Sequence, residues 1–421
     1  MNGAATLYNA GPAAALDEEI FVNLLDYEDA MPHYAAIINS DPSIFNEVST
    51  PEGNLVGFYS LYDYSKYGGR GDKGYFIRQD WLDDLNLDMP KTYDQLHDVL
   101  TAFKTEKGAD SAFVLPVSGM NDFVTGGFGI GSTFYVEDGT IKFGPLEQGY
   151  RDYLELMAKW YSEGLIYADY YNYANEIMFD GTDMIGSGQV ALYYNEVGTM
   201  TAYAEYSNDP DFLVRAIAPV SQEEGGKIYP TEFHYTPVDN ARWSITTNCE
   251  DPELAVQLCD YLYTTDGILL ANYGVEGVSF EYDANGEPVF TDLIINNPDG
   301  YDFALCLIKY TSSTPCSICI NERNYLGYTD AQVSAIDLWL RNTTSVQAPG
   351  AVWSVDAQTE YSGIASDVGS YVSTTCLQFI TGGKSMDEWD SFIDEVTTSF
   401  DIDRMTELYQ NAIDAYLSIG A

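Results

Sequence analysis

The residues suited to metal or nucleophilic chemistry are few and poorly spaced for it. Among six cysteines, Cys316 and Cys319 form one CxxC motif, with no second pair at the spacing of a zinc site. The three histidines, His33, His97 and His234, form neither an HExxH nor an HxH pattern. We therefore expect buried free thiols, no bound metal ion and no cofactor.

Carboxylates are the one reactive group in large excess. The chain of 421 residues has 65 acidic and 18 basic side chains, a formal charge of −47. Two carboxylates about 5–5.5 Å apart suffice for a retaining glycosidase, so a carbohydrate-active enzyme is one alternative. No GxSxG motif, Cys/His pair or cofactor fingerprint indicates another reaction. The charge argues against nucleic acid and anionic lipid as partners, because both are bound through lysine and arginine.

Aromatic residues are abundant, with 35 tyrosines, 19 phenylalanines and 6 tryptophans. A tyrosine offers an apolar ring face and a hydrogen-bonding tip. Sugars present the matching surfaces, C–H patches that stack on rings and hydroxyls that need polar partners. Because rings also fill ordinary cores, composition alone leaves a core role as the simpler interpretation.

Alternating strands and helices must position these side chains, which indicates an α/β protein. Amphipathic spacing predicts helices over 93–104, where Thr92 and Gln95 form a capping box, and over 150–163. Apolar runs predict short strands over 75–78, 112–116, 189–194 and 243–248. No stretch approaches the 18 or so apolar residues of a membrane helix, and the length favours two domains.

Several segments together resemble the extracellular solute-binding proteins of bacterial ABC importers, family 1, the sugar-binding class that includes maltose-binding protein. The branch it looks most like is the lipoprotein group of Gram-positive bacteria. The order and spacing of the segments carry the likeness over roughly 55–416. The segments are FIRQDWL (76–82) with MPKT (89–92), AFK (102–104), TTNCEDPE (246–253), DG (266–267), NYGVEG (272–277), YDANG (282–286), and FITG (379–382) with Trp389.

The resemblance implies an α/β fold of the two-lobed, periplasmic-binding-protein-like (type II) class, with a hinge and an interlobe cleft. It implies an N-terminal lobe of residues 1–80 and 248–310 and a C-terminal lobe of 81–247 and 311–421. The chain would cross between lobes near 78–81, 243–247 and 311–317. Trp81 is expected in a core, and Arg78 is expected to pair with Asp80 or with an acid across the hinge.

The same resemblance implies a function without chemistry. A monomer would capture a carbohydrate, an oligosaccharide in this branch, by hinge closure and deliver it to the membrane permease subunits of an ABC importer. The full-length protein would be extracellular and lipid-anchored at the cell surface. A surface interaction protein without a small ligand is a third hypothesis, which a failure of any sugar to change the tryptophan fluorescence would favour.

The sequence departs from the family in two places. The family begins with a signal peptide, a lipid-anchored cysteine and a strand–helix–strand unit before the segment matching 4–9, so we expect an N-terminally truncated sequence here. Many relatives carry a calcium loop after the segment matching 102–104. Here residues 105–110 are too few and include Lys107, so we expect no calcium at that loop.

In this fold the ligand contacts lie where strands end at the cleft. Loops that follow the expected strands hold rings for stacking and acids or amides for hydroxyls, and these are the candidate ligand-binding residues. They are Tyr8, Asn9, Tyr62, Asp63, Tyr64, Asn121, Phe123, Asn195, Arg242, Trp243, Trp353 and Tyr361.

Overall fold

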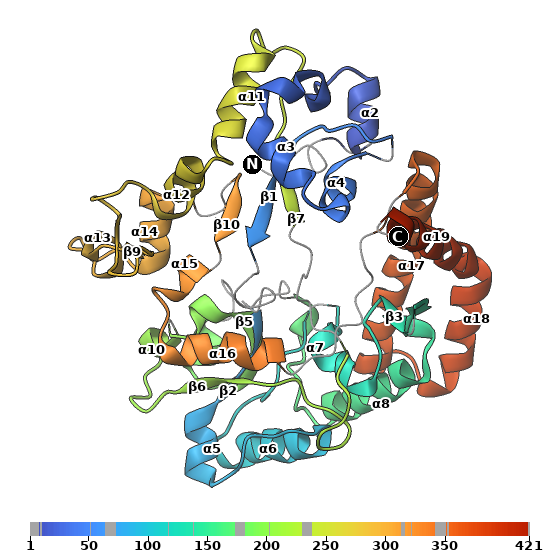
Figure 1. Ribbon diagram of the computed structural model, residues 1–421. Helices are drawn as coiled ribbons and strands as arrows, with labels where there is room; N and C mark the ends of the chain where they lie inside the picture. Colours follow the sequence, from blue (N-terminus) through green and yellow to red (C-terminus); the bar gives the residue numbers. More distant parts are fainter. Residues whose placement is uncertain are drawn as a thin grey trace.

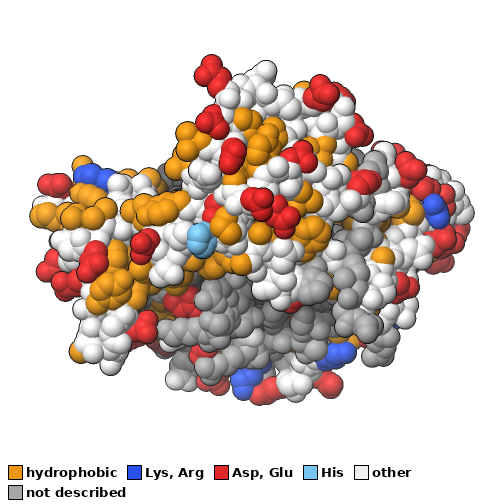
Figure 2. Space-filling model, turned by 45° about the horizontal axis from the view of Figure 1, so that its top comes forward, with side chains coloured by type: hydrophobic (Ala, Val, Ile, Leu, Met, Phe, Trp, Pro, Cys, Tyr) orange, Lys and Arg blue, Asp and Glu red, His pale blue; other side chains and the backbone are white. Residues whose placement is uncertain are grey.

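The computed structural model describes residues 8, 11–50, 52–63, 73–116, 118–137, 139–172, 182–201, 203–229, 238–312, 316–320, 322–341, 351 and 353–419. Figure 1 shows these elements as an upper and a lower group around a central region. Figure 2 shows acidic side chains spread over the visible face and few lysines or arginines, as the composition predicts.

Two separate three-stranded sheets organise the two groups. The first sheet has the order β10–β1–β7, with β1 parallel to β10 and antiparallel to β7. The second has the order β5–β2–β6 and is antiparallel throughout. The strands are β1 (Phe58–Asp63), β2 (Lys73–Arg78), β5 (Leu192–Glu196), β6 (Val214–Ile217), β7 (Val238–Trp243) and β10 (Ile318–Ile320).

Helices surround each sheet. Around the first lie α2 (Gly11–Asp17), η1 (Leu24–Ala30), α3 (Pro32–Ile38), α4 (Pro42–Val48), α11 (Pro252–Tyr261), α12 (Thr265–Tyr273), the hairpin β8 (Phe280–Tyr282) and β9 (Pro288–Phe290), α13 (Asp292–Ile295) and α14 (Phe303–Tyr310). Around the second lie α5 (Gln79–Leu85), α6 (Tyr93–Glu106), α7 (Asp122–Thr125), the hairpin β3 (Phe134–Glu137) and β4 (Thr140–Phe143), α8 (Gln148–Ser162), α9 (Thr182–Gly186), α10 (Tyr203–Tyr206), α16 (Asp330–Arg341), α17 (Val355–Thr381), α18 (Trp389–Ser399) and α19 (Ile402–Ile419). The short helix α15 (Glu322–Tyr325) lies between the two groups.

Each sheet has its own hydrophobic core. Phe58 and Leu61 of β1 pack with Val256 of α11 in one cluster. Phe76 of β2 packs in another with Trp339 of α16, whose ring is 5.3 Å from the Phe76 ring. We call residues 8–63 with 238–320 the first lobe, and residues 73–229 with 330–419 the second lobe.

Strand pairing places the lobe boundaries at positions that differ from the predicted ones. β2 belongs to the second sheet, so the chain changes lobe between Asp63 and Lys73 and not near residue 80. β7 and β10 both pair with β1, so the other passages lie before Val238 and after Ile320, instead of near 247 and 310. Residue type marks a strand but does not identify its partner strand, and the partner decides the lobe.

Local patterns predicted several elements well. The helices expected over 93–104 and 150–163 span Tyr93–Glu106 and Gln148–Ser162. The expected strand over 243–248 is largely wrong, because β7 ends at Trp243 and only Thr246 makes an isolated bridge, to Phe21. Residues 112–116 likewise form only isolated bridges, through Phe113.

Buried tyrosines should make the fold sensitive to alkaline pH. Burial raises the pKa of Tyr203 and of Tyr273 from 10.0 to about 12. Between these values the unfolded chain loses protons that the folded protein keeps, so stability is full below pH 10 and decreases as the pH rises towards 12. We expect the melting temperature, followed by circular dichroism, to fall across this interval. A melting temperature that stays constant up to pH 12 would contradict this expectation.

Candidate functional site

A pocket of about 400 Å³ opens in the second lobe between the β3–β4 hairpin, α17 and α19. Aromatic rings and hydroxyl groups share its wall. The rings belong to Phe134, Phe143, Tyr361 and Tyr409, and the hydroxyls to Ser118, Ser132, Thr133, Tyr361, Ser373 and Tyr409. The rest of the wall is formed by Met120, Pro145, Ala365, Val368, Gly369, Val372 and Met405.

Helical periodicity brings the pocket residues of α17 onto one face. Tyr361, Ala365, Val368 and Val372 recur at the three- and four-residue spacing of a helix stripe. The helix begins where the Ser354 side chain accepts a hydrogen bond from the Ala357 backbone N–H at 3.2 Å. This start leaves Trp353 just outside the helix, eight residues before Tyr361.

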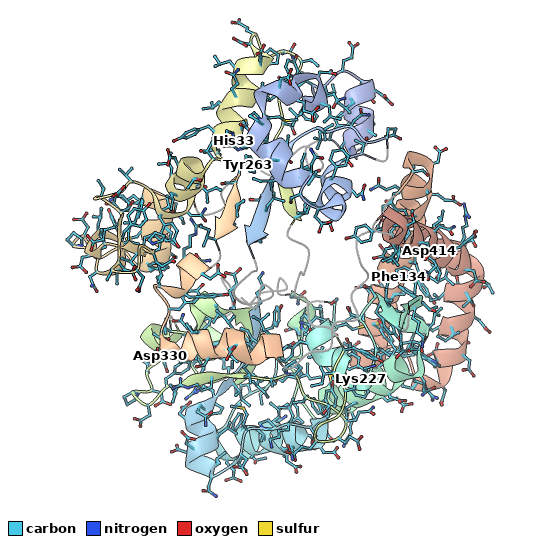
Figure 3. All side chains as sticks on the ribbon, in the orientation of Figure 1. His33, Phe134, Lys227, Tyr263, Asp330 and Asp414 are labelled. Atoms are coloured by element: carbon cyan, nitrogen blue, oxygen red, sulfur yellow. The ribbon has the colours of Figure 1, made fainter. Side chains whose placement is uncertain are left out.

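The β3–β4 hairpin is fixed against α19 by one side chain. Gln410 Oε1 accepts a hydrogen bond from the Ile141 backbone N–H at 3.0 Å, and its Nε2 donates to the Gly139 carbonyl at 3.4 Å. Gln410 follows Tyr409, so the same segment of α19 anchors the hairpin and supplies a ring to the pocket. Figure 3 labels Phe134 of β3 and Asp414 of α19 close together at this end of the molecule.

Four rings form a connected aromatic cluster at the pocket. The Trp353 and Tyr409 rings are stacked with centroids 5.6 Å apart and an interplanar angle of 18°. Tyr361 lies 4.7 Å from Trp353 and 5.5 Å from Tyr409, and Phe134 meets Tyr409 edge-on at 5.3 Å. Burial raises the pKa of Tyr361 to about 12, so its hydroxyl is neutral and can donate a hydrogen bond at physiological pH. Such a cluster suits a sugar ring with polar edges.

The pocket lies on the side of the second lobe that meets the first lobe. α19, which supplies Met405 and Tyr409, contacts α4 of the first lobe, and α4 in turn contacts β7. In Figure 1, α4 lies to the left of the C-terminal end of the chain. A ligand held in the pocket could therefore be approached by the first lobe.

Among the twelve candidate residues, Trp353 and Tyr361 are brought together at this pocket. Tyr62 lies near the end of β1, opposite Cys319 of β10, and is half-buried. Asp63 and Arg242 lie on strands, but their side chains are outside what the structure describes. Asn9 and Tyr64 lie outside the described residues altogether.

Three other candidates are buried in the second lobe. Asn195 is fully buried, donates to the Tyr203 hydroxyl and accepts from the Glu196 backbone N–H at 2.7 Å. Asn121 is buried and accepts from the Val124 backbone N–H at 3.1 Å. Phe123 packs 4.5 Å from the ring of Tyr75 inside the core. In this structure, contacts within the protein account for the positions of these three side chains without a ligand.

Trp243 and Tyr8 lie elsewhere on the first lobe. β7 enters the first sheet at Val238, opposite Leu61, and reaches Trp243 opposite Phe58, at the other end of the strand from the lobe passage. The Trp243 side chain is exposed. Tyr8 donates its hydroxyl hydrogen to Glu18 and packs beside Ala15. Neither residue lines the aromatic pocket.

Arg78, Trp81 and the thiols behave as predicted. Arg78 Nε donates to Asp80 Oδ1 at 2.8 Å, and Trp81 is buried in the core. Five of the six cysteines are buried, and Cys249 is half-buried.

Sequence reasoning missed Tyr409, Phe134 and Phe143. Met405 and Tyr409 lie on the same face of a strongly amphipathic segment. The amphipathic pattern shows that this face is packed, but it does not identify the element that packs against it. Phe134 and Phe143 are opposite each other across a hairpin whose turn contains Gly139 in the left-handed region (φ 78°). These signals predict local structure, whereas the meeting of hairpin and helix depends on tertiary packing.

No metal-binding cluster and no membrane-spanning helix occur among the described residues. Nowhere in them do three or more His, Cys, Asp or Glu side chains converge as a metal ion requires. In the segment where no calcium was expected, Lys107 Nζ forms an ion pair with Asp84 at 2.6 Å. Within the same residues, none of the helices combines the length and the apolar character needed to cross a bilayer.

Comparison with known proteins gives no matching family model, but it gives three relevant relatives. The polygalacturonan/rhamnogalacturonan-binding protein YtcQ of Bacillus subtilis is 25% identical over 296 residues, covering 67% of this chain and 56% of YtcQ. Lipoprotein LipO of the same organism is 24% identical over 282 residues, covering 63% of this chain and 53% of LipO. The chain thus spans about half the length of these two curated relatives. The fructooligosaccharide ABC transporter substrate-binding protein FusA of Streptococcus pneumoniae is 29% identical over 152 residues, 32% of this chain and 28% of FusA.

Solved structures show the same fold over almost the whole chain. The alginate-binding protein AlgQ2 without calcium ion matches with a TM-score of 0.77 at 23% identity, covering 94% of this chain and 82% of that one. FusA in complex with kestose matches with a TM-score of 0.73 at 18% identity, covering 96% and 85%. The chain is therefore similar in fold to solute-binding proteins over almost its whole length. Its fold is the two-lobed type II fold of such proteins, as the resemblance predicted.

Two of the three relatives are named for binding, and none is named for catalysis. YtcQ and FusA are named as binding proteins and LipO as a lipoprotein. The names of the binding proteins make the aromatic pocket the place to look for a ligand.

Proposed function

We propose that this chain captures a carbohydrate, in particular an oligosaccharide, between its lobes and releases it unchanged to the permease subunits of an ABC importer. The observation that carries the proposal is a pocket walled by four rings and several hydroxyls, on the side of the second lobe that meets the first. Ring stacking supplies apolar contact to a sugar face, and hydroxyls and backbone groups supply its hydrogen bonds.

The last of the three connections between the lobes, which follows β10, supports movement of the lobes about a hinge. Arg323 of α15 donates from Nη1 to the Asn272 carbonyl at 2.8 Å and from Nη2 to the Ser312 carbonyl at 2.7 Å, which fastens it to the first lobe. On the second lobe, Gln332 Nε2 donates to the Val197 carbonyl at 3.0 Å. Residues 324–331 therefore join two separately anchored bodies, the arrangement in which a few residues absorb a hinge rotation.

The location and assembly of the protein are part of the same proposal. LipO is named as a lipoprotein and FusA as part of an ABC transporter, which supports surface anchoring and permease partners for this chain. The formal charge of −47 favours a soluble monomer, because two copies would repel each other. No observation favours the glycosidase alternative, since the described wall of the pocket contains no aspartate or glutamate.

A binding and closure experiment tests the proposal. Isothermal titration with neutral and acidic oligosaccharides should yield at least one ligand with a Kd near micromolar, about −8 kcal/mol. Small-angle X-ray scattering with that ligand should show a smaller radius of gyration, and chromatography should recover the ligand intact. Cleaved ligand would support the glycosidase, and no binding by any sugar would support the surface interaction hypothesis.

A further inference from the structure

The described wall of the aromatic pocket contains no basic group. The elements that frame it, the β3–β4 hairpin, α17 and α19, carry two basic side chains, Lys142 and Arg404. The same elements carry seven acidic side chains, one on β3, three on α17 and three on α19. The frame therefore has an excess of five negative charges.

Both cations are held by carboxylates. Arg404 Nε and Nη2 donate to the two carboxylate oxygens of Glu360 at 2.9 Å each, and Nη1 donates to Glu407 Oε2 at 3.1 Å. Lys142 Nζ pairs with Glu137 Oε2 at 2.7 Å. Arg404 lowers the pKa of Glu360 through its hydrogen bonds, and Lys142 does the same for Glu137, so these carboxylates remain charged near neutral pH. A guanidinium fork is the side chain best suited to bind a ligand carboxylate, and the one on α19 is occupied.

We infer that the pocket selects neutral oligosaccharides and rejects those built of uronic acids. The inference rests on the proposed function and adds a ligand class to it. It departs from the names of two of the matched proteins, because polygalacturonan and alginate are both polymers of uronic acids. A neutral sugar needs only rings and hydroxyls, which the wall supplies, whereas a uronate would place its charge in a negative field without a partner.

Isothermal titration with matched trisaccharides tests the inference. Kestose and xylotriose serve as neutral probes, and trigalacturonate and an alginate trimer as acidic ones. We expect the better neutral probe to bind at least about tenfold more tightly than either acid at low salt, and the difference to shrink at high salt as the field is screened. Tighter or equal binding of a uronate overturns the inference and leaves the proposed function standing. Absence of binding by all four probes overturns both.

A double variant sharpens the test. Glu360→Gln with Glu407→Gln releases the Arg404 fork, and we expect trigalacturonate affinity to rise about tenfold or more while neutral affinity stays within about twofold. Glu253→Gln with Glu281→Gln is the matched control. It removes the same two charges from exposed positions of the first lobe, on α11 and β8. Equal gains in uronate affinity in both double variants would show that only net charge matters, and would overturn the role given to the pocket frame.

Discussion

Replacing Arg78 with alanine should lower the free energy of unfolding by about 3–5 kcal/mol. The Arg78 side chain is almost fully buried, and its Nη2 donates to Asp209 Oδ2 at 2.8 Å in addition to its bonds with Asp80. Its guanidinium carbon lies 4.3 Å from the centre of the Trp81 ring and 4.5 Å from that of Phe212. Truncation would leave the nearly buried Asp80 carboxylate without its counter-charge and open a gap between two rings.

Urea unfolding at pH 7, followed by circular dichroism, measures this loss. Arg78→Lys should recover only part of the stability, because an ammonium group cannot bond both carboxylates as a planar fork does. Arg404→Ala, which breaks ion pairs at the protein surface, is the control and should cost far less. If Arg78→Ala cost no more than Arg404→Ala, the buried pair would have no structural importance.

The Arg78 site shows what sequence reasoning can and cannot reach. Asp80 is two residues away, so its pairing with Arg78 was predictable from proximity. Asp209 and Phe212 reach the same guanidinium through pairing of β2 with β6, and no local pattern identifies that strand partner. The helices were predictable for the corresponding reason, since capping and amphipathic spacing are local.

The lobe boundaries and the pocket depend on long-range pairing in the same way. β1 and β2 are near neighbours in sequence and were expected on one side of the first boundary, yet they belong to different sheets. For the pocket, Trp353 and Tyr361 stood out as rings in one stretch of chain. Tyr409 and Phe134 join them only because α19 and the β3–β4 hairpin fold against α17. The rule that ligand contacts follow strand ends also selected Phe123, which points into a core.

Tyr361→Ala should reduce oligosaccharide affinity by about 30-fold or more, the 2 kcal/mol or greater loss typical of a central aromatic contact. Tyr361 lines the pocket, and its ring contacts the rings of Trp353, Tyr409 and Phe134. Removing the Tyr361 ring therefore deletes one stacking face and loosens the packing of these three neighbouring rings. The test is isothermal titration with the best ligand of the wild-type protein.

Two further variants separate the roles of the Tyr361 ring, its hydroxyl and the fold. Tyr361→Phe keeps the ring, so we expect a loss within about tenfold, the value of one hydrogen bond. Tyr371→Ala is a matched control on the same helix, because the Tyr371 ring packs 5.0 Å from Phe400 and 6.0 Å from Phe392, outside the pocket. It should lower the melting temperature and leave affinity unchanged. If Tyr371→Ala weakened binding as much as Tyr361→Ala, the loss would reflect a damaged helix, and the aromatic pocket would not be where the sugar binds.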